Sequence, residues 1–117
     1  TGLEQALETV HALEAEFRAE LALPDDGGAI DAELEKALRL EDFFGLASLM
    51  LRDALAREES CGAHFREEHQ TPEGEALRDD AHFAHIAAWE HCGTAEPRRH
   101  TEPLQFTTVQ PSRRDYR

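Results

Sequence analysis

The residues that could do chemistry gather in one stretch of the chain, from Arg57 to His69. Its sequence, REESCGAHFREEH, holds a serine, a cysteine, two histidines, two arginines and four glutamates in thirteen positions. A serine or cysteine beside a histidine can act as a nucleophile, because the histidine accepts its proton. Histidines and carboxylates can also bind a metal ion. Paired arginines and carboxylates can instead fix the shape of a loop.

A hydrolytic centre would use Ser60 or Cys61 together with His64. However, Ser60 follows a predicted helix, and the stretch lacks the G-x-S-x-G turn that exposes the nucleophile of α/β-hydrolases. A helix that ends near Gly62 explains the same residues without catalysis. We therefore rank a small hydrolase below a structural interpretation and keep it as an alternative.

A metal site would draw on the seven histidines of the chain. No C-x-x-C or H-E-x-x-H motif occurs. Glu8 and His11 form one E-x-x-H pair, but a di-iron bundle needs two such pairs and further glutamates. The other candidates are scattered along the second half: His64, His69, His82, His85, His91 and Cys92. We expect no metal ion here, and histidines that bond to nearby carboxylates.

The remaining feature is the pairing of arginines with carboxylates, which favours a structural role for this stretch. Arginine forks that bind carboxylates order a loop when they are partly buried. The residues that can form such a network are Arg57, Glu59, Arg66, Glu67, Arg78, Asp79 and Asp80. No G-x-G-x-x-G or P-loop is present, so we predict no complete flavin or nucleotide site within these residues.

Composition narrows the class of protein. The chain has 117 residues, which is about one domain, and 40% of them are hydrophobic. A net charge of -13 argues against nucleic acid as a partner. No apolar run approaches the roughly 20 residues that span a bilayer, and no secretory signal is visible. The two cysteines, Cys61 and Cys92, are expected to be free thiols.

Two helices should position this stretch. The first covers residues 3–22, with a capping box at Thr1 and Glu4, and the second covers about 29–59, with Gly45 at a close helix contact. Pro24, Gly27 and Gly28 separate them. The first apolar stripe is Leu3, Leu7, Val10, Leu13 or Glu14, Phe17 and Leu21; the second is Leu34, Leu38, Phe43, Leu46, Leu49, Met50 and Leu55. Two helices make an incomplete core, so we expect that the chain lacks a part of this domain on its N-terminal side.

The remainder should be an ordered loop and a partly extended tail. Asp79 or Asp80 could cap a short helix over residues 79–88, or residues 85–91 could form a strand. Residues 104–109 alternate apolar and polar, which predicts a strand that pairs with 85–91. The predicted fold is mainly α: a spectrin-repeat-like helical bundle without its first helix, with a long C-terminal tail. We expect a helical hairpin over residues 1–62, and the loop and tail over 63–117.

The polar stretch also resembles a known family. The pattern R-x-E-S-x-G-A-H-x-R-x-(D/E), followed by R-D-D, is similar to the C-terminal domain of the flavoprotein subunit of succinate dehydrogenase and fumarate reductase. It is carried by Arg57, Glu59, Ser60, Gly62, Ala63, His64, Arg66, Arg78, Asp79 and Asp80. The closing P-x-x-R-x-Y of that family is matched by Pro111, Arg114 and Tyr116. Unlike most of the family, this chain has Cys61 in place of an arginine and Phe83 in place of a tryptophan.

The resemblance implies a structural role within a larger enzyme. In the family, FAD is bound covalently to a histidine of another domain, and the dicarboxylate site also lies outside the matching segment. We therefore expect no catalytic, cofactor-binding or metal residue in these 117 residues. The parent would interconvert succinate and fumarate by hydride transfer through FAD. Electrons would then pass to an iron–sulfur subunit and a membrane quinone.

The resemblance also implies partners and a place in the cell. This domain would support the flavin-binding domain of its own chain, in a complex with an iron–sulfur subunit and a membrane anchor. It would lie on the cytoplasmic side of the bacterial inner membrane, as a peripheral part. The isolated chain should associate with itself through exposed helix faces. The alternative from another class is a stand-alone acidic helical module that binds a protein partner.

Overall fold

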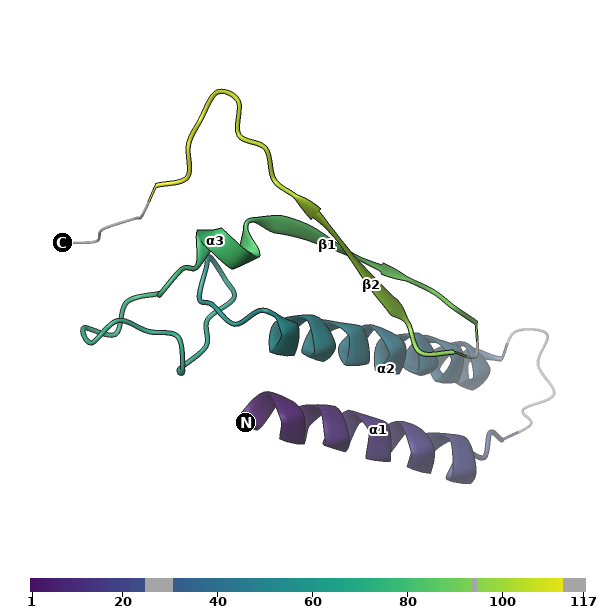
Figure 1. Ribbon diagram of the computed structural model, residues 1–117. Helices are drawn as coiled ribbons and strands as arrows, with labels where there is room; N and C mark the ends of the chain where they lie inside the picture. Colours follow the sequence, from purple (N-terminus) through teal and green to yellow (C-terminus); the bar gives the residue numbers. More distant parts are fainter. Residues whose placement is uncertain (25–30, 94, 113–117) are drawn as a thin grey trace. The chain divides into compact units, whose positions relative to one another are not determined.

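The computed structural model describes residues 1–24, 31–93 and 95–112 and divides the chain into two compact units, Thr1–Ala56 and Arg57–Arg117. The first unit contains the helices α1 (Gly2–Glu20) and α2 (Ala32–Ala56). The second contains the short helix α3 (Asp80–Phe83) and the strands β1 (His85–Glu90) and β2 (Arg98–Pro103) (Figure 1).

Helix α1 begins with the predicted capping box. The Thr1 hydroxyl accepts the Glu4 amide N–H at 3.4 Å, and the Glu4 carboxylate lies 2.5 Å from the N-terminal amine. These contacts satisfy donors that the first turn leaves without helical partners. Of the two residues proposed for the middle of the stripe, Glu14 is half-buried and Leu13 is 50% exposed. Glu14 therefore occupies the middle of the stripe, because the Arg18 guanidinium binds its carboxylate at 3.0 Å.

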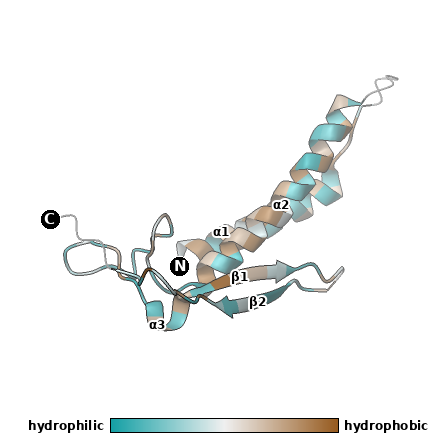
Figure 2. Cartoon of the chain, turned by 90° about the horizontal axis from the view of Figure 1, so that it is seen from above, coloured by the Kyte–Doolittle hydropathy of each residue, from teal (hydrophilic) through white to brown (hydrophobic). Residues whose placement is uncertain are grey.

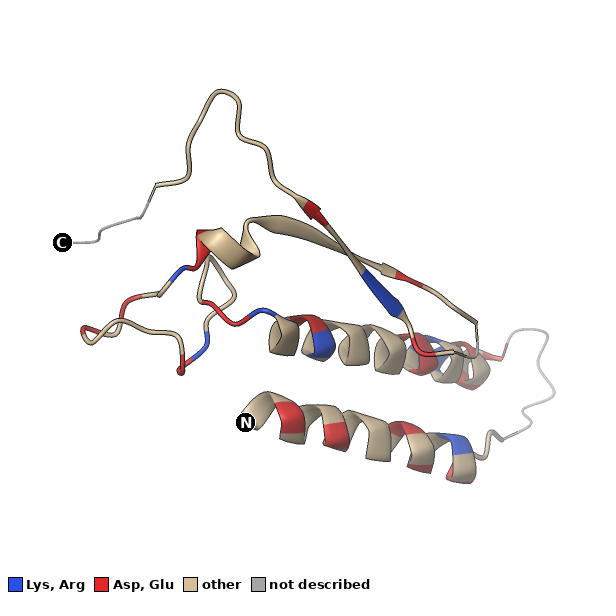
Figure 3. Ribbon diagram, viewed as in Figure 1, with Lys and Arg blue, Asp and Glu red and all other residues tan. Residues whose placement is uncertain are grey.

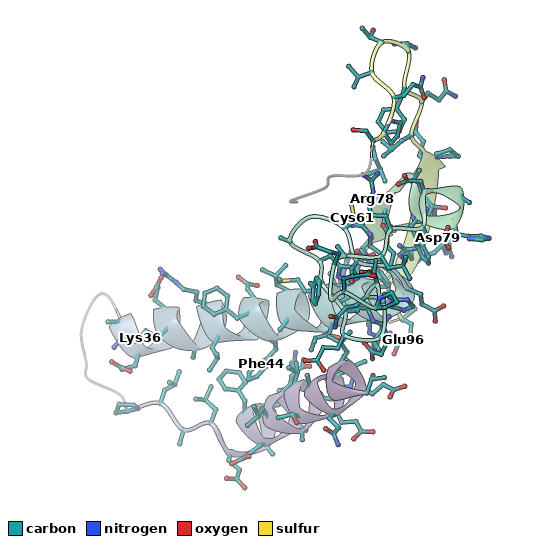
Figure 4. All side chains as sticks on the ribbon, turned by 90° about the vertical axis from the view of Figure 1, so that its left-hand side faces the viewer. Lys36, Phe44, Cys61, Arg78, Asp79 and Glu96 are labelled. Carbon is teal, nitrogen blue, oxygen red and sulfur yellow. The ribbon has the colours of Figure 1, made fainter. Side chains whose placement is uncertain are left out.

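The two helices form the predicted antiparallel hairpin. Contacts join His11 to Ser48 at 3.2 Å, the Phe17 and Phe44 rings at 5.5 Å, and Arg18 to Glu41 at 2.8 Å. Residue numbers therefore fall along α2 as they rise along α1. Figure 4 shows Phe44 directed toward α1. Ala37 is the one buried hydrophobic residue among those described, so the hairpin has a thin core.

The predicted apolar stripe of α2 was wrong for most of its members. Leu34, Leu38, Phe43, Leu46 and Met50 are all exposed, while the face toward α1 carries Glu41, Phe44 and Ser48. Apolar residues occur on several faces of α2, so their spacing does not select one face. Gly45 does not mark a close contact, because a Cβ built there meets no atom within 4 Å.

Helix α2 is also shorter than predicted. The Asp31 carboxylate accepts the N–H groups of Glu33 and Leu34 at 3.0 and 2.9 Å, which caps the start. The helix ends at Ala56 rather than near Glu59. Glu59 leaves the helical path because its carboxylate is buried in the polar loop that follows.

The second unit contains one antiparallel β-hairpin. Strand β1 confirms the predicted strand over 85–91, and Asp79 caps α3 by accepting the His82 amide N–H at 3.3 Å. The predicted strand over 104–109 was wrong, because β1 pairs with Arg98–Pro103 instead. Glu90 attracts His100 at 2.8 Å and Arg98 at 3.6 Å, whereas residues 104–109 are exposed and form no strand. Opposite charges across the two strands therefore decide which segment pairs with β1, and the alternation of apolar and polar residues over 104–109 does not.

The fold is thus mixed rather than a pure helical bundle. The helical hairpin is present as predicted, but a two-stranded sheet accompanies it. Residues 104–112 form no helix or strand, which agrees with an extended tail. Within the described ranges, no helix is long and apolar enough to cross a membrane.

Candidate functional site

Ser60 is completely buried and holds two parts of the polar loop together. Its hydroxyl donates to the Arg66 carbonyl at 3.1 Å and accepts the Arg66 amide N–H at 2.8 Å. Its own amide N–H donates to the Leu77 carbonyl at 2.9 Å. A buried hydroxyl needs such partners, since an unmade bond costs about 1–3 kcal/mol. Ser60 thereby connects the start of the loop to Arg66 and to Leu77 near its end.

Glu59 is only 2% exposed and acts as a second link. One carboxylate oxygen accepts two bonds from the Arg57 guanidinium, at 2.8 and 2.6 Å. The other accepts the Asp79 amide N–H at 2.9 Å. A buried carboxylate is tolerated where a cation and further donors surround it. The side chain therefore fixes the start of the loop against the cap of α3.

A tight turn follows Ser60. Cys61 and His64 exchange backbone hydrogen bonds of 2.8 and 3.1 Å, and Gly62 has a φ of +61° at the tip beside the exposed Ala63. Glycine suits this position because residues with a Cβ rarely adopt positive φ. The His64 ring atom Nε2 lies 2.9 Å from the Arg57 carbonyl, so the ring donates back to the entry of the loop.

Arg78, Asp79 and Asp80 form the end of the loop. Arg78 donates to the Asp80 carboxylate at 2.5 Å and to the Ser112 carbonyl at 3.1 Å, which attaches the tail to this loop. The bond to Asp80 raises the pKa of Arg78, and burial opposes it. The Asp79 carboxylate lies 2.7 Å from Nδ1 of His82, and this bond lowers the pKa of Asp79.

The structure brings together most of the residues that the motif singled out. Arg57, Glu59, Ser60, His64 and Arg66 share one network, which reaches Asp79 through its backbone. Pro111 is exposed in the tail, and Arg114 and Tyr116 lie outside the described residues. Glu67, which was predicted to join the charge network, is exposed. Glu68 pairs with Arg66 instead, at 3.6 Å. Backbone hydrogen bonding lowers the pKa of Glu68 most, and Arg66 lowers it further.

Sequence reasoning missed the backbone partners of this network, namely the carbonyls of Arg57, Leu77 and Ser112. Every amino acid carries a carbonyl, so no residue type marks these positions in a sequence. The one available signal was the serine itself, because a short hydroxyl side chain often bonds to nearby backbone.

The geometry does not support a hydrolytic centre. Arg66 uses both hydrogen-bonding directions of the Ser60 hydroxyl, and the His64 ring bonds to a backbone carbonyl. Cys61 is a half-buried free thiol, as is Cys92, which confirms the prediction of free cysteines. A nucleophile needs a base within hydrogen-bond reach, and these bonds join neither Ser60 nor the His64 ring to such a partner.

The histidines are mostly engaged with single partners. Among the described residues, no three histidine, cysteine or acidic side chains gather as a metal site. His82 and His100 bond to the carboxylates of Asp79 and Glu90, as predicted. The prediction was wrong for His11, His64 and His85, which bond to Ser48 or to backbone carbonyls.

The described residues contain no glycine-rich turn of the kind that binds a dinucleotide. A flavin dinucleotide needs a glycine-rich turn whose free N–H groups open a long helix toward the pyrophosphate. Here Thr1 and Asp31 already cap the two long helices, and the glycines with positive φ lie in turns that open no such helix: Gly62, Gly74 and Gly93. A shallow depression beside the loop is lined by Glu58, His69, Leu77, Arg78, Asp79, His82 and Phe83. Its lining combines charged side chains with the apolar Leu77 and Phe83.

Comparison with known proteins places the chain in a family. The family described as fumarate reductase flavoprotein C-term matches residues 1–116. One subunit of the fumarate reductase (CoM/CoB) of Methanothermobacter marburgensis is 41% identical over 66 residues, which are 56% of this chain and 12% of that protein. No solved structure matches. The chain thus spans about an eighth of this relative. It belongs to the fumarate reductase and succinate dehydrogenase flavoprotein family, whose C-terminal domain it matches.

Proposed function

We propose that this chain is the structural C-terminal domain of a longer flavoprotein that interconverts succinate and fumarate through FAD. The proposal rests on the burial and the hydrogen bonding of the motif residues. The Ser60 hydroxyl and the Glu59 carboxylate are buried and fully bonded within the protein, so they are not available to a substrate. Residues placed in this way stabilise a fold, and the reacting groups would belong to another domain.

The finer parts of the proposal concern cofactor, partners and place. FAD would bind outside these residues, and electrons would pass to an iron–sulfur subunit and then to quinone at a membrane anchor. This assembly would lie on the cytoplasmic side of the bacterial inner membrane and serve the tricarboxylic acid cycle. The family match supports a flavoprotein. The relative's name specifies CoM/CoB, so the identity of the electron partner needs its own test.

The exposed apolar faces of α2 favour a second candidate, a stand-alone acidic helical module that binds a protein partner. The two functions differ in one observable property. A flavoprotein domain would be purified as part of a chain that retains flavin, and a binding module would not.

The experiment uses the longest natural protein that contains these residues. Its acid precipitate is examined for flavin fluorescence, and succinate-dependent dye reduction is compared with fumarate-dependent oxidation of a reduced viologen. The proposal predicts protein-bound flavin and activity with both dicarboxylates. Quinone analogues, and the CoM and CoB named for the relative, are then compared as electron partners. Absence of flavin would contradict the proposal and favour the binding module.

A further inference from the structure

The exposed apolar residues of α2 include one regular row. Phe43, Leu46 and Met50 are 55%, 56% and 63% exposed, and Arg39 and Asp53 continue the row at its two ends. The steps along the row alternate between four and three residues. That spacing keeps side chains on one face of a helix, and a partner helix can pack along it. We call these five residues the α2 row.

The α2 row lies away from the other helix of its own unit. The residues that contact α1 are Glu41, Phe44 and Ser48, which have the same spacing but a different phase. At 3.6 residues per turn, the two sets are centred roughly 170° apart around the helix. Figure 2 shows hydrophobic segments along α2 among hydrophilic ones. The hairpin therefore leaves the row open to a partner.

The charges at the two ends identify an occupant. Arg39 lies toward the start of α2 and Asp53 toward its end. Figure 3 shows that basic and acidic segments both occur near each end of this helix. Two copies packed in parallel would set like charges against each other. Two antiparallel copies would place Arg39 against Asp53 twice, with Leu46 at the centre and Phe43 against Met50. The row is thus complementary to itself under a two-fold axis.

We propose that the α2 row binds the α2 row of a second copy of this chain in an antiparallel pair. This proposal does not depend on the proposed function. Both end residues already have contacts in their own chain: Arg39 binds Glu35, and the half-buried Asp53 also has a partner. A guanidinium has five donors and a carboxylate about four acceptor positions, so each group can take a further contact from the second copy. Three apolar side chains per copy make a small contact compared with stable dimers. The dissociation constant should therefore be on the order of 10–100 μM.

The test is sedimentation equilibrium of the 117-residue chain over a range of concentrations, at about 0.15 M salt so that the net charge is screened. Leu46→Glu places two carboxylates at the centre of the pair and should abolish the dimer. Leu13→Glu is the matched control, since Leu13 is 50% exposed and lies on α1. It should leave the dimer intact. Far-UV circular dichroism checks that both variants keep their helices.

A charge exchange tests the orientation. Arg39→Asp alone, or Asp53→Arg alone, should weaken the dimer about tenfold, because each sets like charges together twice. The double variant should recover most of the affinity. A strict monomer throughout would overturn the second copy as occupant and leave the row to a different helix. A dimer that persists in Leu46→Glu, or a double variant no tighter than the single ones, would also overturn the proposal.

Discussion

At the scale of single residues, Glu59 is the side chain on which the order of the loop depends most. Glu59→Gln would keep its size but set an amide against donors from Arg57 and Asp79. We expect the second unit to lose about 2 kcal/mol of unfolding free energy. Urea unfolding followed by the fluorescence of Trp89, the single tryptophan, measures this. Glu58→Gln is the control, since Glu58 is exposed. Equal stability of the two variants would contradict the assignment.

Asp79 should make the second unit sensitive to acid. Its pKa is lowered, first by the hydrogen bond from His82, while burial opposes the shift. A lowered carboxyl pKa stabilises the folded state above the ordinary pKa, and this contribution is lost as pH falls through the folded value. Stability should therefore fall below about pH 4.

Two variants identify the source of that pH dependence. Asp79→Asn retains an oxygen that can cap α3 but removes the titration, so its stability should change less between about pH 4 and 2. His82→Phe removes the hydrogen-bond donor to Asp79 and should likewise reduce the change in stability over this pH range. Urea unfolding at a series of pH values provides the measurement. If the unfolding free energy of both variants falls with pH as steeply as that of the wild type, other groups cause the acid sensitivity.

At the scale of elements, the same substitution should have opposite effects at two glycines. Gly45→Ala lies within α2 in open space and should stabilise the first unit by about 0.5–1 kcal/mol. Gly62→Ala lies at a φ of +61° in the turn after Ser60 and should cost the second unit about 1 kcal/mol. Helical circular dichroism reports the first effect and Trp89 fluorescence the second. Effects of the same sign would contradict these backbone assignments.

The elements also show what the sequence could predict. The capping box of α1, the hairpin and β1 follow from local patterns, and the structure has all three. The packing face of α2 does not, because apolar residues surround that helix. Strand β2 was missed for a related reason. Its residues R-R-H-T-E-P look unlike a strand until Glu90 is known to lie across from them.

For the candidate site, the sequence predicted which side chains matter better than how they are held. The motif identified Arg57, Glu59 and Asp79, and the structure joins them. Ser60 looked like a candidate nucleophile because a sequence does not show burial. Its complete burial against Arg66 changes that interpretation. The partners that hold it are backbone groups, which have no signature in a sequence.

At the scale of the whole molecule, the chain consists of two units with different kinds of stability. The first is a hairpin with one buried hydrophobic residue among those described, and it exposes the α2 row. The second is ordered by a buried polar network and a small sheet. A thin core and open apolar faces are typical of a part that is completed by other protein surface.

The central claim is that the motif residues order this domain and do not react. The most direct test is turnover per bound flavin in the longer flavoprotein proposed above, with Ser60→Ala introduced. This substitution leaves the Arg66 amide N–H without its hydroxyl partner. We predict a lower unfolding temperature with unchanged turnover per flavin. An unchanged unfolding temperature with turnover per flavin lost would contradict the claim and make Ser60 part of the chemistry.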